Sequence, residues 1–202
     1  MALGSLANIS VNTDAGNGAM LMPKLQYRFR VSLDNFGAGG GDTTELTKQV
    51  IDVTRPNLSF ENMEVHTYNS KSHLAGKHTW QPITLTLRED VSNVVQRLVG
   101  QQLQKQFDFA NQSSAATGSD YKFQLAIEIL DGGNGSTEGG VGVLERWECY
   151  GCFIVTANYN TLNYAESAPV TTTLEIQYDN AVQITDGVGN GARGAGGTSV
   201  SG

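Results

Sequence analysis

The chain has 202 residues, a net charge of −7 and only two cysteines, which are too few to build a disulfide scaffold. Proteins that grip nucleic acid by its phosphates need clustered cations, so the acidic balance argues against that class. No apolar run approaches the ~20 residues that cross a bilayer, and the N-terminus lacks the pattern of a signal peptide. The composition therefore predicts a soluble, acidic protein, and we expect no membrane anchoring by this chain.

Glycine contributes 24 residues, most of them near the two ends and in two internal stretches. Glycine loses more conformational freedom on ordering than any other residue, so such stretches favour loops and flexible ends. We therefore divide the chain into a flexible N-terminal segment (1–21), a β domain (22–183) and a glycine-rich C-terminal tail (184–202). Within the domain, Asp131–Gly142 is predicted to be a long glycine-rich loop.

The first predicted elements are strands. Tyr27–Leu33 alternates apolar and polar residues, which is typical of a half-buried strand. Leu58–Tyr68 is a less regular strand candidate, and an irregular stretch up to Gly76 is expected to follow it. Trp80–Leu87 alternates more clearly, with leucine and isoleucine on one face and threonine on the other.

A single convincing helix is predicted to begin at Asp90, which is a plausible N-cap residue. Gly100 lies within it and lowers its intrinsic helix propensity, so packing must hold the helix in place. Its apolar residues fall near helical spacing and predict one buried stripe: Val91, Val94, Val95, Leu98 and Leu103.

Three further strands complete the predicted domain. Tyr121–Ile129 and Val170–Val182 alternate regularly, and Val143–Tyr159 is a long strand or bent pair with a bulge or bend at Gly151. Many alternating strands and one helix predict a mainly β fold. We expect two packed β-sheets, as a sandwich or open barrel, with one flanking α-helix.

Cys149-Tyr-Gly-Cys152 has the C-x-x-C spacing of redox and metal sites. A strand, not a helix, is predicted to follow it, and residues three apart on a regular strand point to opposite faces unless a bulge at Gly151 realigns them. Buried strand cysteines are therefore the favoured interpretation. The spacing of the histidines does not match a helical zinc motif either: His66, His73 and His78.

Motifs for nucleophilic catalysis, phosphate binding or dinucleotide binding are not found, so we expect neither an enzyme nor a bound cofactor or metal. A small-molecule or metal-binding β-barrel that uses the cysteines and histidines remains the alternative from a different functional class.

The order of several blocks is informative. Arg55–Asp108 runs from an extended segment through a threonine-rich strand into the helix, and Leu144–Trp147, Cys152–Tyr159 and Thr171–Asp179 follow. Over roughly residues 22–183 this arrangement resembles the major tail tube protein of contractile-tailed bacteriophages, the myovirus-type tail tube family. The resemblance implies a ring-forming structural subunit, whose hexameric rings stack into a hollow tube through which DNA passes into the host.

By this resemblance, the segment from Arg55 to Lys77 supplies much of the contact between stacked rings. It mixes charged residues with apolar anchors, as interfaces do. The alternative is a long exposed hairpin with no partner. The candidates for inter-ring stacking are Arg55, Glu61, Met63, Glu64, Tyr68, Lys71, Leu74 and Lys77.

The resemblance also implies a lumen that DNA passes without sticking, and an acidic wall repels phosphates. Residues 106–202 carry 3 basic and 11 acidic side chains, which motivates a search for the wall in that half. The lumen-facing candidates lie on the polar faces of two predicted strands: Gln124, Glu128, Glu175 and Gln177.

The implied partners are further copies of the chain, the tail sheath protein, the tape measure protein, and the baseplate and tail-terminator proteins, with genomic DNA in transient passage. The implied location is the virion tail tube, after assembly in the host cytoplasm. Two alternatives within the same class stay open. The chain could form the tube of another contractile injection device, such as type VI secretion or a bacteriocin, or it could be a baseplate protein that initiates the tube.

Overall fold

A computed structural model describes residues 24–37, 43–130 and 142–184. The predicted segment 1–21, most of the predicted tail and all but the last residue of the predicted 131–142 loop lie outside these ranges. The elements, in chain order, are β1 (Phe29–Asp34), α1 (Thr44–Lys48), β2 (Val50–Val53), β3 (Asn57–Thr67), β4 (Ser70–Gln81), β5 (Ile83–Arg88), α2 (Val94–Gln106), β6 (Phe107–Asp108), β7 (Ser113–Ser114), α3 (Gly118–Tyr121), β8 (Phe123–Leu130), β9 (Val143–Asn158), β10 (Thr171–Gln177) and β11 (Asn180–Ile184).

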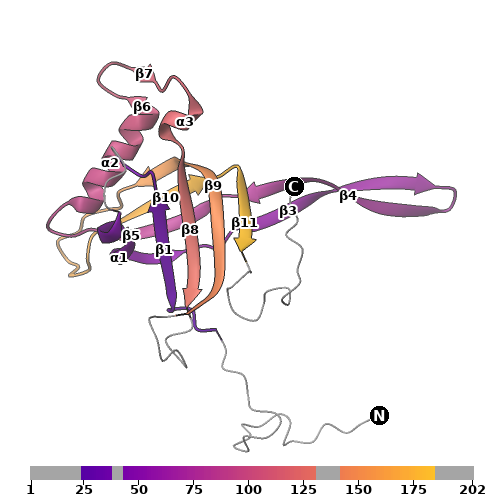
Figure 1. The fold of residues 1–202 in the computed structure, drawn as a ribbon, viewed down its shortest axis with the longest axis horizontal. Coiled ribbons are helices and arrows are strands. Elements are labelled where there is room, and N and C mark those ends of the chain that lie inside the picture. Colours follow the sequence, from indigo (N-terminus) through magenta and orange to yellow (C-terminus); the bar gives the residue numbers. More distant parts are fainter. Residues whose placement is uncertain (1–23, 38–42, 131–141, 185–202) are drawn as a thin grey trace, which may run out of the picture.

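Seven strands form one antiparallel sheet in the order β1-β8-β9-β10-β5-β2, with β11 paired to β9. The long strand β9 belongs to two parts of this sheet. Its first part lies between β8 and β11. These three strands, together with β1 beside β8, form what we call the front half-sheet. Its second part, residues 153–158, pairs with β10. This second part and the strands β10, β5 and β2, in that order, form the rear half-sheet. The two half-sheets are seen one behind the other in Figure 1, and the predicted mainly β fold is confirmed.

The core lies between the two half-sheets. Burial alternates along β8 and along β10, as the apolar and polar alternation predicts, because successive strand residues point to opposite faces. Both half-sheets and α2 contribute to a single cluster of buried side chains, which includes Val31, Leu33, Ile83, Leu85, Leu87, Val95, Leu98, Val99, Phe123, Leu125, Ile127, Ile154, Leu174 and Ile176.

Both cysteines also belong to this core. Leu125 pairs with Cys149 and Phe123 pairs with Cys152, so β9 carries one extra residue at this point. Gly151 has a φ of 67°, and this bulge turns both thiols inward instead of to opposite faces. Burial raises the pKa of the Cys149 thiol to about 12. The predicted buried strand cysteines are confirmed.

Helix α2 begins later than predicted. Its first helical residue is Val94, and the preceding Asn93 is in the left-handed region with a φ of 55°. Asp90 therefore does not cap the helix, and Val91, which was expected in the apolar stripe, is fully exposed. The short turn from Asp90 to Asn93 separates β5 from the helix, so Val91 points away from the core.

Two glutamines fasten α2 to other elements. Gln102 is fully buried; its Oε1 accepts from the Gly37 N–H at 3.0 Å and its Nε2 donates to the Tyr121 carbonyl at 2.6 Å. One turn later, Gln106 accepts from the Ile154 N–H and donates to the Ile154 carbonyl, both at 3.0 Å. Each side-chain amide thus pairs with backbone groups as a strand would, which stabilises the position of the helix.

Strands β3 and β4 form a hairpin, hereafter the arm, which extends far beyond the body (Figure 1). Its pairing runs from Asn57 opposite Gln81 to Thr67 opposite Ser70, so the stretch predicted to be irregular is a strand, interrupted by one register shift between Phe60 and Asn62. Every residue of β3 is exposed. With no buried face, the arm shows no clean alternation in sequence, and that explains why its second strand was not predicted.

The helices in the described ranges are short. The longest helix, α2, has 13 residues, and in the described ranges no helix combines the length and apolar character needed to cross a bilayer.

Candidate assembly interface

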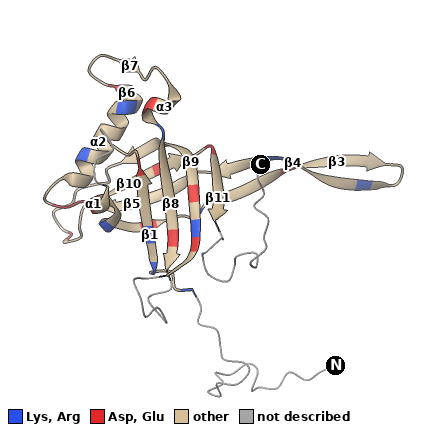
Figure 2. Ribbon diagram, viewed as in Figure 1, with Lys and Arg blue, Asp and Glu red and all other residues tan. Residues whose placement is uncertain are grey.

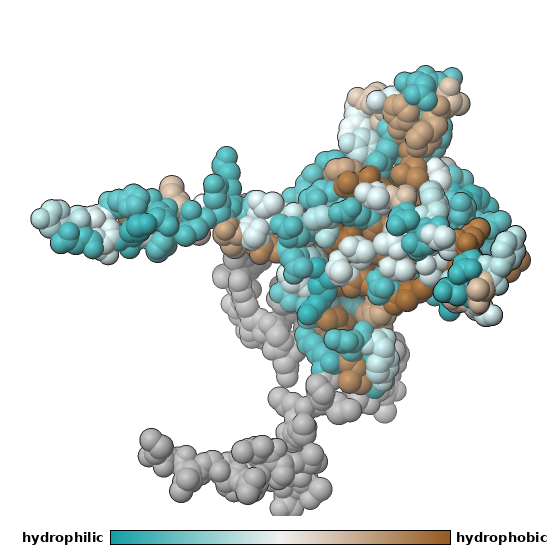
Figure 3. Space-filling model, turned by 180° about the vertical axis from the view of Figure 1, so that it is seen from behind, coloured by the Kyte–Doolittle hydropathy of each residue, from teal (hydrophilic) through white to brown (hydrophobic). Residues whose placement is uncertain are grey.

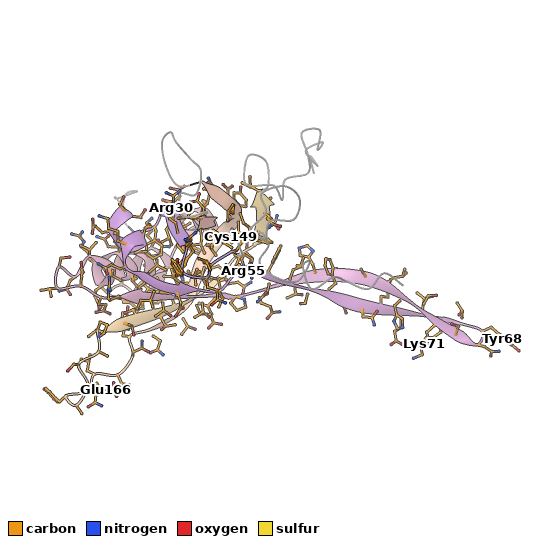
Figure 4. All side chains as sticks on the ribbon, turned by 90° about the horizontal axis from the view of Figure 1, so that it is seen from below. Arg30, Arg55, Tyr68, Lys71, Cys149 and Glu166 are labelled. Carbon is orange, nitrogen blue, oxygen red and sulfur yellow. The ribbon has the colours of Figure 1, made fainter. Side chains whose placement is uncertain are left out.

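Seven of the eight predicted stacking residues lie on the arm. Tyr68 is fully exposed at its tip, and Lys71 lies close behind (Figure 4). Met63 pairs with Leu74 across the two strands, and each has about half of its surface exposed, at 51%. On the opposite face of the ribbon, Lys71 forms an ion pair with Glu64 at 2.9 Å.

An arm of this kind is not expected to stand alone. A two-stranded ribbon is at best marginally stable in water without a covering layer. The arm nevertheless exposes large apolar side chains along its length, and such surfaces mark sites of protein association. These exposed residues are Leu58, Phe60, Met63, Val65, Tyr68 and Leu74. The arm therefore has the properties of an interface that another protein surface covers.

Arg55 has a different place from the other stacking candidates. It lies at the base of the arm (Figure 4), with its Nη1 3.8 Å from Glu145 Oε1 on β9. Glu145 is 8% exposed and also accepts from Lys24 Nζ and Trp147 Nε1, both at 2.7 Å. Glu145 thus joins three segments of the chain at the point where the arm leaves the body, and Arg55 contributes to the orientation of the arm.

Replacing Glu145 by glutamine is expected to weaken the fold and to flatten its pH dependence. Burial would raise the pKa of Glu145, but hydrogen bonds from Lys24 and Trp147 hold it below the usual 4.5. A lowered pKa contributes stability that is present above pH 4.5 and lost as the pH falls through the folded-state value. Because Lys24 and Arg55 are more than half exposed, we expect a loss of only ~1 kcal/mol at pH 7.

Urea unfolding from pH 3 to 7 measures this effect. Glu61→Gln is the matched control, because Glu61 is exposed and no ion pair involves it among the described residues. A Glu145→Gln variant with the pH profile of the parent would contradict the junction role of Glu145.

The predicted lumen residues divide between two surfaces. Gln124 and Glu128 lie on the outer face of β8, in the front half-sheet, whereas Glu175 and Gln177 lie on the outer face of β10, in the rear half-sheet. Both half-sheets direct their inner faces to the common core, so the two outer faces point away from each other. All four side chains therefore cannot line one lumen formed by a single face.

The outer face of the front half-sheet carries paired charges. Arg30 contacts Glu128 at 2.6 Å, Arg146 contacts Glu128 at 3.5 Å, and Arg146 also contacts Glu148 at 2.6 Å. Glu128 is only 5% exposed beneath these arginines. Basic and acidic residues lie next to each other on β1, β8 and β9 in Figure 2. The charge of Glu128 is thus neutralised locally, and it offers no repulsive wall.

The outer face of the rear half-sheet is rich in threonine. Thr173 pairs with Thr86, and Glu175 lies between Thr84 and Thr156, whose hydroxyl donates to it at 3.2 Å. Seen from behind, the middle of the body shows many weakly polar residues (Figure 3). Along β10 and the second part of β9 this face carries no lysine or arginine among the described residues. It has the smooth, weakly acidic character that the lumen hypothesis requires.

The rear half-sheet also has two free edges. Within residues 24–37, 43–130 and 142–184, strand β2 pairs only with β5, and residues 153–158 of β9 pair only with β10. Gln106 covers the second edge at Ile154, and beyond that point the backbone of β9 is open to a partner. Each edge carries a register shift next to an exposed aliphatic residue, Ile51 in β2 and Val155 in β9. The unpaired N–H and C=O groups of an edge strand are a template for pairing with another chain, and a bulge limits that pairing to the residues on either side of it.

The residues considered for metal binding are not gathered together. His66, His73 and His78 are spread along the arm, far in sequence from the buried, unbridged Cys149 and Cys152. Across the ranges that the structure describes, no group of three histidine, cysteine or acidic side chains is close enough to hold a metal ion.

Solved structures share this fold over most of the chain. One is a chain of the anti-feeding prophage cap, a tube-terminating cap, at 14% identity and a TM-score of 0.57, with 83% of this chain and 94% of that chain covered. Another belongs to the anti-feeding prophage baseplate, at 12% identity and a TM-score of 0.59, with 82% and 97% covered. The mainly β architecture of this chain matches the tube-protein fold.

A third structure with the tail-tube fold comes from the PVC sheath-tube complex of an extracellular contractile injection system in the extended state. It is 15% identical, with a TM-score of 0.57 and coverage of 81% of this chain and 92% of that chain. No protein-family model matches the sequence, and no curated protein matches it significantly. At these identities the likeness establishes the fold alone. The role of this chain is therefore inferred from its own surfaces.

Proposed function

We propose that this protein is a structural subunit that assembles into stacked hexameric rings, forming the hollow tail tube of a contractile injection particle. The observation that carries the proposal is the rear half-sheet, which combines two free edges with an uncovered, threonine-rich outer face. Head-to-tail pairing of one edge with the other on the next copy closes a ring when the rotation closes. In such a ring the rear half-sheets join into one barrel.

In this ring the outer face of the rear half-sheet lines the lumen. Glu175 and Gln177 then face the lumen, whereas Gln124 and Glu128, on the front half-sheet, face outward. A wall of threonine, glutamine and glutamate has few cations to hold phosphates, which suits the passage of DNA through a phage tail. The same wall also suits the cargo of another contractile device, such as type VI secretion or a bacteriocin.

The remaining parts of the proposal follow from this role. The chain acts without catalysis and without a cofactor, as a passive conduit. Its partners are further copies of itself, a sheath protein, a tape measure protein, and the proteins of the baseplate and the tube terminus, in a particle assembled in the cytoplasm. A position at the tube end is the second candidate, because two similar structures come from a cap and a baseplate.

Electron microscopy of the purified full-length protein tests the proposal directly. We expect rings that stack into tubes at high protein concentration. Rings that never stack would favour the tube-end position, and a protein that stays monomeric under all conditions would contradict the ring proposal.

Placing a lysine on either free edge is expected to abolish ring formation while the subunit stays folded. Ile51→Lys and Val155→Lys each put a charge where the neighbouring strand must pair, and edge lysines oppose strand addition. Both side chains are about half exposed, so the fold itself loses little. Analytical ultracentrifugation is expected to show monomers, with circular dichroism like that of the parent.

Val182→Lys is the matched control. Val182 is 43% exposed on β11, in the front half-sheet, so a lysine there is expected to leave the rings intact. Loss of rings in Val182→Lys together with intact rings in Val155→Lys would assign ring closure to the front half-sheet instead.

A further inference from the structure

The two ends of the rear half-sheet carry different projections. At one end, where Ile83 lies opposite Ile176, the arm leaves the body. At the other end, where Arg88 lies opposite Thr171, the chain forms the loop of residues 159–170, hereafter the rim loop. Figure 4 shows Tyr68 at the far end of the arm and Glu166 on the rim loop beyond the opposite side of the body. In a ring, these projections extend from opposite rims.

The rim loop is closed at its base by side-chain hydrogen bonds. Asn160 has a φ of 53°, and its Nδ2 donates to the carbonyl oxygen and to the hydroxyl oxygen of Thr171, at 2.9 and 2.8 Å. Its own N–H donates to Asn158 Oδ1 at 3.0 Å. These bonds join the start of the loop to the start of β10. A loop of this length with a fixed base and no regular structure is commonly functional.

The apolar side chains of the rim loop point away from the body. Leu162 is 78% exposed and Tyr164 is fully exposed, and Val170 is exposed at 41%. They surround an open hollow that residues of the loop itself line. Glu166 is the only charged residue between 159 and 170. An aromatic and a leucine on a short, nearly uncharged surface have the composition of a protein contact.

We propose that the rim loop is the surface that receives the arm of a second copy in the next ring. This inference rests on the proposed ring function, because stacked rings with the same orientation bring one rim against the opposite rim. The arm of one ring then cannot meet another arm. It meets the rim that carries Leu162 and Tyr164.

The chemistry of the two surfaces supports this pairing. Met63 and Leu74 lie opposite each other on one face of the arm, with Val65 two residues further along the same strand. Glu64 and Lys71 occupy the other face and already neutralise each other. The arm thus offers a short apolar strip of Met63, Leu74 and Val65, with the exposed Glu61 at the end of the same face towards the body. Leu162 and Tyr164 offer the matching apolar partners.

A double substitution separates stacking from ring formation. Leu162→Ser with Tyr164→Ser is expected to leave rings of parental size in electron micrographs and to eliminate tubes. Met63→Ser with Leu74→Ser is expected to have the same effect from the arm side. The matched control is Tyr27→Ser, which removes a 72% exposed tyrosine just before β1, and tubes are expected to persist.

Cross-linking identifies the contact itself. Two singly substituted chains, Tyr164→Cys and Leu74→Cys, are mixed, assembled and treated with a short bis-maleimide; the native thiols are buried and unreactive. We expect a cross-linked dimer, and none when Tyr27→Cys replaces Tyr164→Cys.

Tubes that form without this cross-link, or that survive the Leu162 and Tyr164 double substitution, would overturn the pairing and leave the ring proposal standing. A parent protein that forms no rings would overturn the ring proposal first, before any variant is compared.

Discussion

Gly151→Ala is expected to lower the free energy of unfolding by about 3 kcal/mol. A left-handed backbone costs a residue with a Cβ ~1–2 kcal/mol, and crowding costs a similar amount. A Cβ at Gly151 would lie 2.2 Å from Asp179 Oδ2, so Asp179 must move and its 2.5 Å ion pair with Lys122 is lost. Urea unfolding at a concentration below that of ring formation measures the change.

A second variant separates the two causes. In an Asp179→Ala background most of the steric conflict is removed, so Gly151→Ala is expected to cost only the ~1–2 kcal/mol of the backbone strain. Gly100→Ala is the control, because its Cβ meets nothing within 4 Å in helix α2 and it is expected to stabilise the protein by ~0.5–1 kcal/mol. Equal stability of Gly151→Ala and the parent would mean that the bulge is not required.

Thiol reactivity reports on the same bulge. Cys149 and Cys152 both face the core only because β9 carries one extra residue there. In folded parent protein, both thiols are expected to resist a disulfide reagent at pH 8, since burial raises their pKa. In Gly151→Ala we expect faster reaction, because the less stable fold opens more often and exposes both thiols.

Gln102→Ala is expected to cost about 3 kcal/mol, comparable to the loss at Gly151. The substitution leaves the Gly37 N–H and the Tyr121 carbonyl without their partner at the buried end of α2, and each unpaired group costs ~1–3 kcal/mol. Thermal unfolding and hydrogen exchange of α2 are the measurements.

Two further variants make the result specific. Gln102→Leu keeps most of the side-chain volume and is expected to be nearly as destabilising, which separates hydrogen bonding from packing. Gln104→Ala, which removes only an exposed bond to Asp108 Oδ1, is expected to change stability by less than ~0.5 kcal/mol. A fully stable Gln102→Leu would show that volume alone is needed at this position.

Some features of the assembly surfaces follow from sequence, and others do not. The outward direction of Glu175 and Gln177 was predictable, because period-two alternation on β10 determines which side chains leave the core. That Gln124 and Glu128 occupy a different outer face was not, since alternation within a strand says nothing about which half-sheet the strand joins. Likewise, no local pattern indicates that Arg30 and Arg146 cover Glu128.

The sequence also did not indicate which polar residues stabilise the fold through contacts between distant segments. Gln102 and Gln106 lie four and eight residues after Leu98, so helical spacing places them on the apolar face of α2, but only the structure reveals their distant backbone partners. Glu145 lies in a strand among charged and aromatic residues, and two of its three partners, Lys24 and Arg55, lie far from it in the sequence. Sequence spacing carries no signal for such contacts, because they depend on tertiary proximity.

By itself, the sequence of this protein determined the half-buried strands β1, β5, β8 and β10, their inner faces and the mainly β class, because burial on one face imposes alternation that is visible locally. The acidic, glycine-rich composition likewise pointed to loops around a normal core. The bulge at Gly151 was predictable as well, but only the tertiary structure decided that β9 serves both half-sheets. It also decided that the exposed segment 57–81 is a continuous arm, and that the arm and the rim loop project from opposite ends of one half-sheet. These features arise from pairing between distant segments, so no local pattern encodes them.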